Sequence, residues 1–449
     1  MRYTPHTSAD KERMLRTIGV RSVEELYQHI PRTLHERARI DLPRGLSELA
    51  VRRQMASLAA QNANAADWSL FLGGGIYNHF IPSAVDAIIS RSEFSTSYTP
   101  YQPEVSQGTL QALFEYQTLI CQLTGMEVSN AAVYDGASAA AEAVLMSRRI
   151  QPSSKRRVLI SKSVHPQYRA VISTYLKNLQ DVHLEEISFD ASGATDIAEL
   201  VRHLDDQSMC VLVGYPNFFG VIEDLAQIKS VCARVGAQLI SVTTEPLALG
   251  LIKPPGEFGV DIAVGEGQSL GVPMNLGGPA FGFFACQKKF VRNIPGRLVG
   301  ETVDTEGRRG FVLTLATREQ HIRREKATSN ICTSQTLCAL GATVFMSLLG
   351  KSGIRRLAEI NVARAHDAHA RLLSKAKIET VFSGPYFNEF VVRTKNLDEI
   401  FGRCAAQKIV PGIKLGQWYP ELQDCLLLCV TEMNEDEEIE HLVRTISRQ

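Results

Sequence analysis

The stretch Met209–Gly267 reads MCVLVGYPNFFGVIEDLAQIKSVCARVGAQLISVTTEPLALGLIKPPGEFGVDIAVGEG. It contains three short apolar runs, at Met209–Asn217, Ala237–Thr244 and Asp261–Gly267. Between the first two runs, Leu225–Val235 has the apolar spacing of an amphipathic helix. Short strands that alternate with helices of about ten residues are typical of βαβ units. The stretch therefore predicts a parallel sheet covered by helices on both faces.

The same alternation extends toward the N-terminus as far as about Val133. The elements predicted there are, in order, a helix at Ala139–Arg149, a strand at Val158–Ser161, a helix at Tyr168–Leu179, a strand at Val182–Phe189 and a helix at Asp196–Leu204. Beyond Gly267, the glycine-rich segment GGPAFGFFA (Gly277–Ala285) closes this part of the chain. We therefore expect one large α/β domain at residues 66–334.

Two further units are expected beside it, since 449 residues are too many for one compact core. Residues 1–65 are polar and form a helical N-terminal extension, in which Ser22–Ile30 opens with a capping serine and two glutamates. Residues 335–449 form a smaller C-terminal α/β domain that begins with a long helix. Its predicted strands are Tyr386–Arg393 and Leu426–Thr431. Its last helix begins near Asp436, and the acidic run Glu432–Glu438 caps the N-terminus of that helix.

Composition limits the function classes. Lys and Arg total 48, and so do Asp and Glu, so no bulk field attracts nucleic acid or an anionic membrane. The N-terminus lacks the apolar core of a signal peptide, and no apolar run reaches the roughly 18 residues of a membrane span. Nine cysteines without a C-x-x-C pair indicate buried free thiols. We expect a cytoplasmic protein that binds no metal, nucleic acid or membrane.

Two segments are candidates for cofactor binding. In GEGQSLG (Gly265–Gly271), leucine stands where a dinucleotide fingerprint needs its third glycine, which argues against a Rossmann site. In DGAS (Asp135–Ser138), the residues immediately before a predicted helix suit a phosphate, because the N–H groups of a helix N-terminus bind anions. The same four residues also fit a turn with a helix cap. The local sequence leaves both interpretations open.

Four longer segments carry a resemblance to a known family. They are FLGGGIYNHFIPSAV (Phe71–Val85), SYTPYQPEVSQGTLQALFEYQ (Ser97–Gln117), GRLVGETVDTEGRRG (Gly296–Gly310) and TREQHIRREKATSNICT (Thr317–Thr333). Together they resemble the P-proteins of the glycine cleavage system, and the match runs nearly end to end. Many bacteria split this protein into two homologous subunits, and this chain has the size of the first. The resemblance implies the aminotransferase-like fold (fold type I) of pyridoxal-phosphate (PLP) enzymes, which agrees with the βα pattern.

The resemblance also shows which groups of a PLP site are missing. The family's catalytic subunit has a lysine between its last sheet strand and a proline followed by a glycine run. Aligning Pro273, Gly277 and Gly278 to that pattern puts Gln268 at the lysine position, and a carboxamide cannot form an imine with an aldehyde. The acid that pairs with the pyridine nitrogen corresponds to Val242, whose isopropyl group cannot stabilise a pyridinium.

Other parts of such a site are present in the sequence. Gly136 and Ser138 are vestigial candidates for binding the cofactor phosphate, and His165 lies near the family's ring-stacking histidine. With the lysine and the acid both absent, we interpret His165 as structural. Another lysine is an alternative imine former: Lys288 and Lys289 follow an apolar strand and are expected to be solvated, whereas Lys326 is flanked by basic residues that would lower its pKa.

Aminotransferase-like active sites lie at a subunit interface, so a subunit without a lysine has a reason to keep its loops. The candidates for side chains that face a partner's active site are Tyr98, Thr99, Tyr101, Glu104, Gln107, Arg323, Arg324 and Lys326. A loop with so many hydrogen-bonding groups needs partners for them. The loop Ser97–Gln107 also fits an internal turn network, and the basic stretch Arg318–Asn330 also fits a solvated helix face. Gly73–Gly75 fits either a wall of the active site or a tight turn.

The resemblance implies a reaction and its partners. The complex would decarboxylate glycine with the help of PLP, release carbon dioxide and pass the aminomethyl group to the lipoyl arm of the carrier H-protein. PLP would be bound covalently by the homologous, lysine-bearing second subunit. This chain alone would be inactive and would complete its partner's active site. Two alternatives remain: a non-catalytic scaffold whose loops never reach that site, and an independent aminotransferase-type PLP enzyme.

Overall fold

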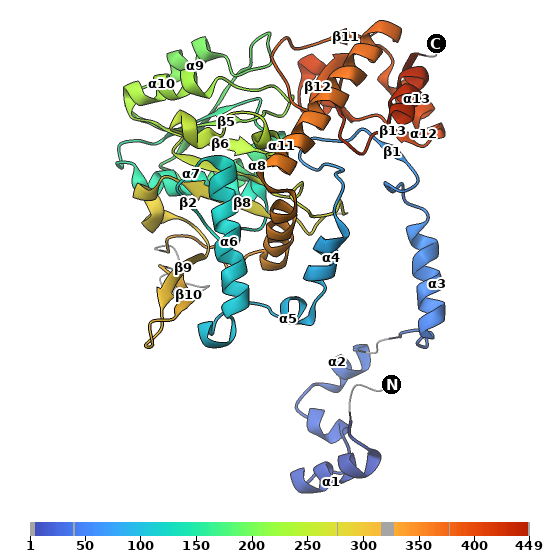
Figure 1. Cartoon of the computed structure of the whole chain (residues 1–449). Helices are drawn as coiled ribbons and strands as arrows, with labels where there is room; N and C mark the ends of the chain where they lie inside the picture. Colours follow the sequence, from blue (N-terminus) through green and yellow to red (C-terminus); the bar gives the residue numbers. More distant parts are fainter. Residues whose placement is uncertain (1–4, 39–40, 276, 316–326, 377, 448–449) are drawn as a thin grey trace. The chain divides into compact units, whose positions relative to one another are not determined.

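The structure is a computed structural model that describes residues 5–38, 41–275, 277–315, 327–376 and 378–447. The chain divides into two compact units, Met1–Ala63 and Asn64–Gln449. Figure 1 shows the elements of both units.

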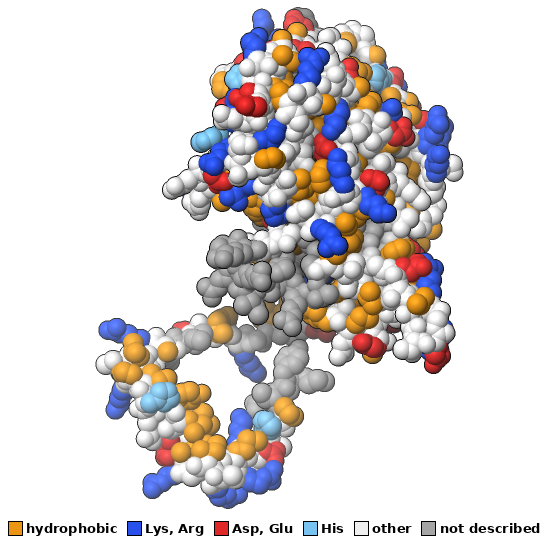
Figure 2. Space-filling view, turned by 90° about the vertical axis from the view of Figure 1, so that its left-hand side faces the viewer, with side chains coloured by type: hydrophobic (Ala, Val, Ile, Leu, Met, Phe, Trp, Pro, Cys, Tyr) orange, Lys and Arg blue, Asp and Glu red, His pale blue; other side chains and the backbone are white. Residues whose placement is uncertain are grey.

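The N-terminal unit is helical, as expected. Its elements are α1 (Ser8–Ile18), η1 (Glu24–Tyr27), α2 (Arg32–Arg37) and α3 (Glu48–Ala59). Thr7 caps α1 through a capping box, and Ser47 caps α3, since each side chain accepts a hydrogen bond from a backbone N–H of the first turn. None of the unit's described side chains is buried. Figure 2 shows apolar side chains beside basic ones on the surface of this unit.

The second unit is built on a seven-stranded, mostly parallel sheet, which confirms the predicted fold class. Its strands are β2 (Val128–Ser129), β3 (Arg157–Ser161), β4 (His183–Ile187), β5 (Ser208–Gly214), β6 (Gln238–Thr243), β7 (Ile262–Glu266) and β8 (Gly282–Cys286), in the order β2-β8-β7-β6-β5-β3-β4. The five strands from β3 to β7 run parallel, and β8 and β2 are antiparallel to their neighbours.

Helices cover both faces of this sheet (Figure 1). On one face, α7 (Gly136–Ile150) and α8 (Pro166–Leu176) pack on a core that includes Val242 and Val264. On the other face lie α6 (Gln107–Thr124), α9 (Ile197–His203), α10 (Leu225–Val235) and the first part of α11. All seven residues of β5 are buried. The continuous apolar runs in the sequence therefore arise because both faces of the central strands are covered.

The smaller C-terminal part begins in helix α11 (Thr336–Lys375), which is kinked at Gly350. Its four-stranded sheet has the order β11-β12-β15-β14, made of Glu379–Thr380, Glu389–Arg393, Cys425–Cys429 and Ile413–Lys414 respectively. Helices α12 (Leu397–Ala406) and α13 (Asp436–Ser447) pack on it. The short strand β1 (Ser69–Leu70) pairs with β13 (Ile409–Val410). The start of the expected large domain at residue 66 therefore pairs with the smaller one.

The remaining elements are connectors and one hairpin. They are α4 (Ser83–Ile89), α5 (Ser92–Ser95), η2 (Pro103–Val105), η3 (Pro246–Gly250), η4 (Pro255–Phe258), η5 (Lys288–Asn293), η7 (Leu415–Gln417), η8 (Pro420–Leu422) and the antiparallel hairpin of β9 (Leu298–Val303) and β10 (Arg309–Thr314). Among the described helices, α11 is long and apolar enough to pass a composition test for a membrane span. Its buried residues, such as Phe345 and Met346, pack in the core with α6, which identifies a core helix.

Candidate functional site

The position that the resemblance assigns to the imine-forming lysine lies in the turn after β7. Gln268 at this position is buried, and its carboxamide is fully used inside the chain. The Tyr77 N–H donates to Gln268 Oε1 at 2.8 Å. Gln268 Nε2 donates to the carbonyl oxygens of Tyr77 at 3.1 Å and Val272 at 2.7 Å. The side chain thus joins the segment before α4 to the large sheet.

The predicted phosphate cradle lies at the N-terminus of α7, where two carboxylates already bind the backbone. The Ser138 N–H donates to Asp135 Oδ1 at 2.7 Å, which is an N-cap. The Gly136 N–H donates to Glu266 Oε2 at 3.0 Å. Glu266 Oε1 also accepts hydrogen bonds from the N–H groups of Gly267 at 3.1 Å and Phe281 at 3.2 Å. Burial raises the pKa of Glu266 to about 8, although these N–H donors oppose the shift.

There is no room for a cofactor phosphate between this helix and the sheet. A Cβ atom on Gly136 would lie 2.3 Å from the Tyr168 hydroxyl oxygen and 2.7 Å from the Glu266 nitrogen. A Cβ atom on Gly282 would lie 2.2 Å from the Asp135 carbonyl oxygen. The helix start therefore contacts the strand ends directly. Together with the hydrogen bonds of Gln268, this means that PLP does not fit these residues, and Gly136 and Ser138 are turn and cap residues here.

His165 is buried, and both of its ring nitrogens are hydrogen-bonded within the chain. The Gln167 N–H donates to Nδ1 at 3.2 Å, so Nε2 carries the proton that is donated to the Gly74 carbonyl oxygen at 2.7 Å. Burial lowers the pKa of His165 to about 4, and its ring packs against Tyr168 and Phe218. His165 therefore holds the glycine loop, Gly73–Gly75, in place.

The same loop approaches a buried carboxyl group. The Gly74 N–H donates to Glu389 Oε1 at 2.6 Å, and a Cβ atom on Gly73 would lie only 2.2 Å from that oxygen. The Tyr77 hydroxyl donates to Glu389 Oε2 at 2.9 Å. Burial raises the pKa of Glu389 to about 8. The glycines of Gly73–Gly75 therefore allow the backbone to lie close to the Glu389 side chain of the same chain.

Val242 lies within β6, with its side chain in the core beneath α7. The first acid after β6 is Glu245, which the sequence did not single out. Its carboxylate contacts the buried His79, whose Nε2 lies 2.8 Å from Glu245 Oε2 and whose Nδ1 lies 2.8 Å from Glu432 Oε2. Burial by itself lowers the pKa of His79, but the two carboxylates outweigh this and raise it to about 10. His79 is thus a buried imidazolium between two carboxylates.

The loop at residues 97–107 presents most of its candidate side chains to solvent. Tyr98 is 74% exposed, and Glu104 is also exposed. Tyr101 is half-exposed, and the Arg297 guanidinium lies 5.8 Å from the centre of its ring, as in a cation–π contact. The Thr99 hydroxyl is buried without a hydrogen-bond partner among the described residues. The outward-facing side chains of Tyr98 and Glu104 are the ones available to another molecule.

Gln107 differs from its neighbours in this loop. Its Nε2 donates to the Phe311 carbonyl oxygen at 2.9 Å, and its Oε1 accepts from the Phe311 N–H at 2.8 Å. The amide is therefore committed to this chain's own β10, whereas we expected it to face a partner. The sequence could not show this, because 204 residues separate the two.

Three of the basic candidates, Arg323, Arg324 and Lys326, lie outside the described residues. Lys288 and Lys289 are exposed, and Lys289 Nζ lies 3.9 Å from an Asp261 carboxylate oxygen, so both are solvated as expected. The part of the chain that the structure describes contains no group of three or more His, Cys, Asp or Glu residues that suits a metal ion.

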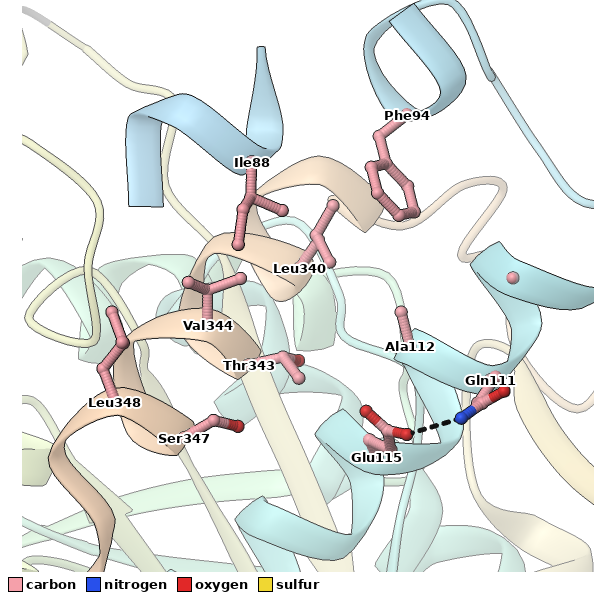
Figure 3. Close-up of a pocket in the computed structure, with 11 residues that line it drawn as sticks. Ile88, Phe94, Gln111, Ala112, Glu115, Leu340, Thr343, Val344, Ser347 and Leu348 are labelled. Carbon is pink, nitrogen blue, oxygen red and sulfur yellow. Dashed lines mark hydrogen bonds between the residues drawn. The ribbon is translucent and has the colours of Figure 1, made fainter. Parts of the chain in front are cut away.

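A surface groove lies between α4, α5, α6 and α11 (Figure 3). Its apolar lining includes Ile88, Phe94, Leu340, Val344 and Leu348. Among the residues that line it, Glu115 alone is titratable, and its carboxylate accepts a hydrogen bond from Gln111. One carboxylate in an apolar groove does not supply the groups that acid–base catalysis requires.

Comparison with known proteins adds the identity of the family. The family model for the glycine cleavage system P-protein matches residues 1–446. Curated relatives named probable glycine dehydrogenase (decarboxylating) subunit 1 include those of Anoxybacillus flavithermus, 48% identical, and Geobacillus thermodenitrificans, 49% identical. Each alignment covers 99% of this chain and 98% of the relative.

Solved structures agree with this result. A crystal structure of glycine decarboxylase (P-protein) of the glycine cleavage system, in inhibitor-bound form, is 43% identical over 100% of this chain and 99% of its own, with a TM-score of 0.90. A sphingosine-1-phosphate lyase from Burkholderia pseudomallei is 13% identical over 91% of this chain and 92% of its own, with a TM-score of 0.67. The fold is therefore that of the aminotransferase-like fold type I enzymes, and the chain belongs to the glycine cleavage system P-protein family.

Proposed function

We propose that this chain is the non-catalytic first subunit of a two-subunit glycine dehydrogenase (decarboxylating). A homologous second subunit holds PLP on its own lysine in this proposal. The assembled complex decarboxylates glycine and passes the aminomethyl group to the lipoyl arm of the H-protein. The observation that carries the proposal is Gln268, whose buried carboxamide makes three hydrogen bonds to backbone atoms within the chain. A group bound in this way neither forms an imine nor leaves room for one.

The proposal also assigns a role to the loop at residues 97–107. Tyr98 and Glu104 are exposed, although Gln107 ties the C-terminal end of the loop to Phe311 of this chain. A loop that is held at one end and turns a phenol and a carboxylate outward suits contact with a ligand on a neighbouring subunit. We therefore assign it to the wall of the partner's active site.

Two other proposals predict different behaviour. An independent PLP enzyme needs an amine where this chain has Gln268, and it needs the N–H groups of the α7 terminus that bind Glu266 and Asp135. These contacts count against it. A scaffold subunit, in contrast, would tolerate changes in the exposed loop as long as the complex assembled.

Isosteric variants of the loop separate the proposal from the scaffold. The complex of this chain with its second subunit is assembled with Tyr98→Phe, Tyr101→Phe or Glu104→Gln, and glycine–bicarbonate exchange is measured. Removing one hydrogen bond to a charged group costs roughly 1.5 to 3 kcal/mol, which is about a tenfold to hundredfold loss if the bond forms only in the transition state. At least one variant should lose tenfold or more.

The control is Tyr175→Phe on α8, a partly exposed phenol in another part of the unit, which should leave exchange unchanged. Full exchange activity in all three loop variants, with assembly intact, would reduce this subunit to a scaffold. A second experiment treats the isolated chain with PLP and borohydride. A stoichiometric pyridoxyl-lysine on any residue would contradict the assignment of PLP to the partner.

The same proposal includes a cytoplasmic location. Six of the nine cysteines are buried free thiols. Free thiols suit a reducing compartment. Activity in a cytosolic fraction, and its absence from membranes, would test this point.

A further inference from the structure

The N-terminus of α7 is a buried helix end whose first backbone N–H groups need hydrogen-bond partners from outside the helix. A helix of 15 residues leaves its first N–H groups without partners inside the helix and places partial positive charge at that end. An anion is the usual partner for such a terminus. Here the terminus is buried, so any N–H group left without a partner would be costly.

Glu266, the last residue of β7, supplies a hydrogen-bond acceptor at this helix terminus. Its two carboxylate oxygens accept hydrogen bonds from three N–H groups that belong to α7, to the turn after β7 and to the residue before β8. These donors are Gly136, Gly267 and Phe281, which are separated from one another by 14 to 145 residues in the sequence. The side chain is 6% exposed. All three partners donate a proton, so the arrangement matches an acceptor-only group, which is the ionised carboxylate that Glu266 becomes above its pKa of about 8.

We infer that the Glu266 carboxylate is a built-in oxyanion that occupies the N-terminus of α7 and closes this chain's own cradle to phosphate esters. The close contacts of Gly136 and Gly282 with the neighbouring backbone keep the carboxylate in place and leave no second anion position beside it. Removing the carboxylate leaves a buried, polar hole lined by three N–H donors. Such a hole binds a small external oxyanion in place of the missing side chain. This inference concerns the chain by itself and goes beyond its role in a partner's active site.

The experiment is a chemical rescue of Glu266→Ala in the full-length chain at pH 9, above the pKa of about 8. The midpoint of thermal unfolding is measured in sodium formate and in sodium chloride at equal ionic strength. Formate at ten times its dissociation constant should raise the midpoint of this variant by roughly 2 °C relative to chloride. The wild-type chain should show no formate-specific shift, because its own carboxylate fills the site.

Val144→Ala is the matched control. Val144 is also fully buried on α7, but it lies within the helix and packs in the apolar core. Its truncation opens an apolar cavity without N–H donors, so formate should not rescue it. An equal response of both variants, or no formate-specific response of Glu266→Ala, would overturn the inference.

Glu266→Gln keeps the test decisive if Glu266→Ala fails to fold. The carboxamide has nearly the same shape, but it turns an N–H₂ group toward one of the three N–H donors. Its unfolding midpoint at pH 9 should therefore fall well below that of the wild type, while Glu115→Gln, at an exposed position on α6, changes little. A Glu266→Gln chain as stable as the wild type at pH 9 would show that no anion is needed there. Neither outcome depends on glycine turnover, so failure here is distinct from failure of the proposed function.

Discussion

The buried imidazolium of His79 offers the sharpest test of how this unit is held together. His79 lies 2.8 Å from a carboxylate oxygen of Glu245 and 2.8 Å from one of Glu432. The exposed fractions of the three side chains are 2%, 2% and 12%. Glu245 follows β6 in the large sheet, whereas Glu432 follows β15 in the smaller one. The three residues therefore form a charged link between the two sheets.

The substitution His79→Leu removes the positive charge and leaves two buried carboxylates facing each other. Breaking a buried ion pair by removing one partner costs about 3 to 5 kcal/mol, because the remaining charge is uncompensated. We expect a loss of this size in the free energy of unfolding at pH 7, measured by urea titration. The control is Arg355→Ala, which breaks a pair with Glu359 whose side chains are 68% and 37% exposed. Exposed pairs contribute at most about 1 kcal/mol.

The pH dependence gives the same prediction an independent readout. The folded-state pKa of His79, about 10, exceeds its ordinary value of 6.5. Its stabilising contribution is therefore complete below pH 6.5 and is lost as the pH rises toward 10. Glu432 has a lowered pKa despite its burial, because His79 outweighs the desolvation, so its own contribution is lost only in acid. The difference in stability between wild type and His79→Leu should shrink steadily between pH 6.5 and 10.

Either of two results would refute this reasoning. A loss below about 1 kcal/mol at pH 7 would mean that the ion pairs contribute no more than surface pairs do. A loss of the expected size that stayed constant from neutral to alkaline pH would mean that His79 acts through its shape and not through its charge.

The other predictions concern single positions. Gln268→Lys removes the acceptor of the Tyr77 N–H, so it should lower the midpoint of thermal unfolding, and borohydride reduction with PLP should yield no adduct at position 268, which mass spectrometry checks. Gly136→Ala forces a Cβ to within 2.3 Å of the Tyr168 hydroxyl and should cost roughly 1 to 3 kcal/mol in urea unfolding. Gly108→Ala, in helix α6, meets no atom within 4 Å and should instead stabilise the chain by about 0.5 to 1 kcal/mol.

The sheet could be predicted because its signal is local. Each of β5, β6 and β7 is a short buried run between polar turns, and every one of their residues is buried. The antiparallel direction of β8 has no such signal, since a run of buried residues looks the same in either direction. The pairing of β1 with β13 joins residues about 340 positions apart, so only the folded chain reveals it.

Long separation in sequence also explains which contacts of the site cannot be predicted from the sequence. The absence of a lysine at position 268 is a property of one residue, and the sequence displays it. The contacts of Glu266 with Gly136, and of His79 with Glu432, span 130 and 353 residues. In the sequence, Glu266 stands only between two glycines of the GEGQSLG segment, and His79 only within the family segment Phe71–Val85. A carboxylate that caps a distant helix cannot be told from a solvated one by its neighbours in sequence.

Three of these contacts have a common consequence for the chemistry of this chain. Gln268, at the position that the resemblance assigns to the lysine, binds the backbone of Tyr77, Glu266 fills the helix terminus, and His165 binds the Gly74 carbonyl. Each of these three side chains is thus a partner in an internal hydrogen bond, and two of them hold the segment around Gly74 and Tyr77. Restoring one lysine would therefore not restore a site, because the other two contacts would still occupy it. Binding PLP would require the chain to give up packing between distant segments, which is a cost of several kcal/mol that no single substitution offsets.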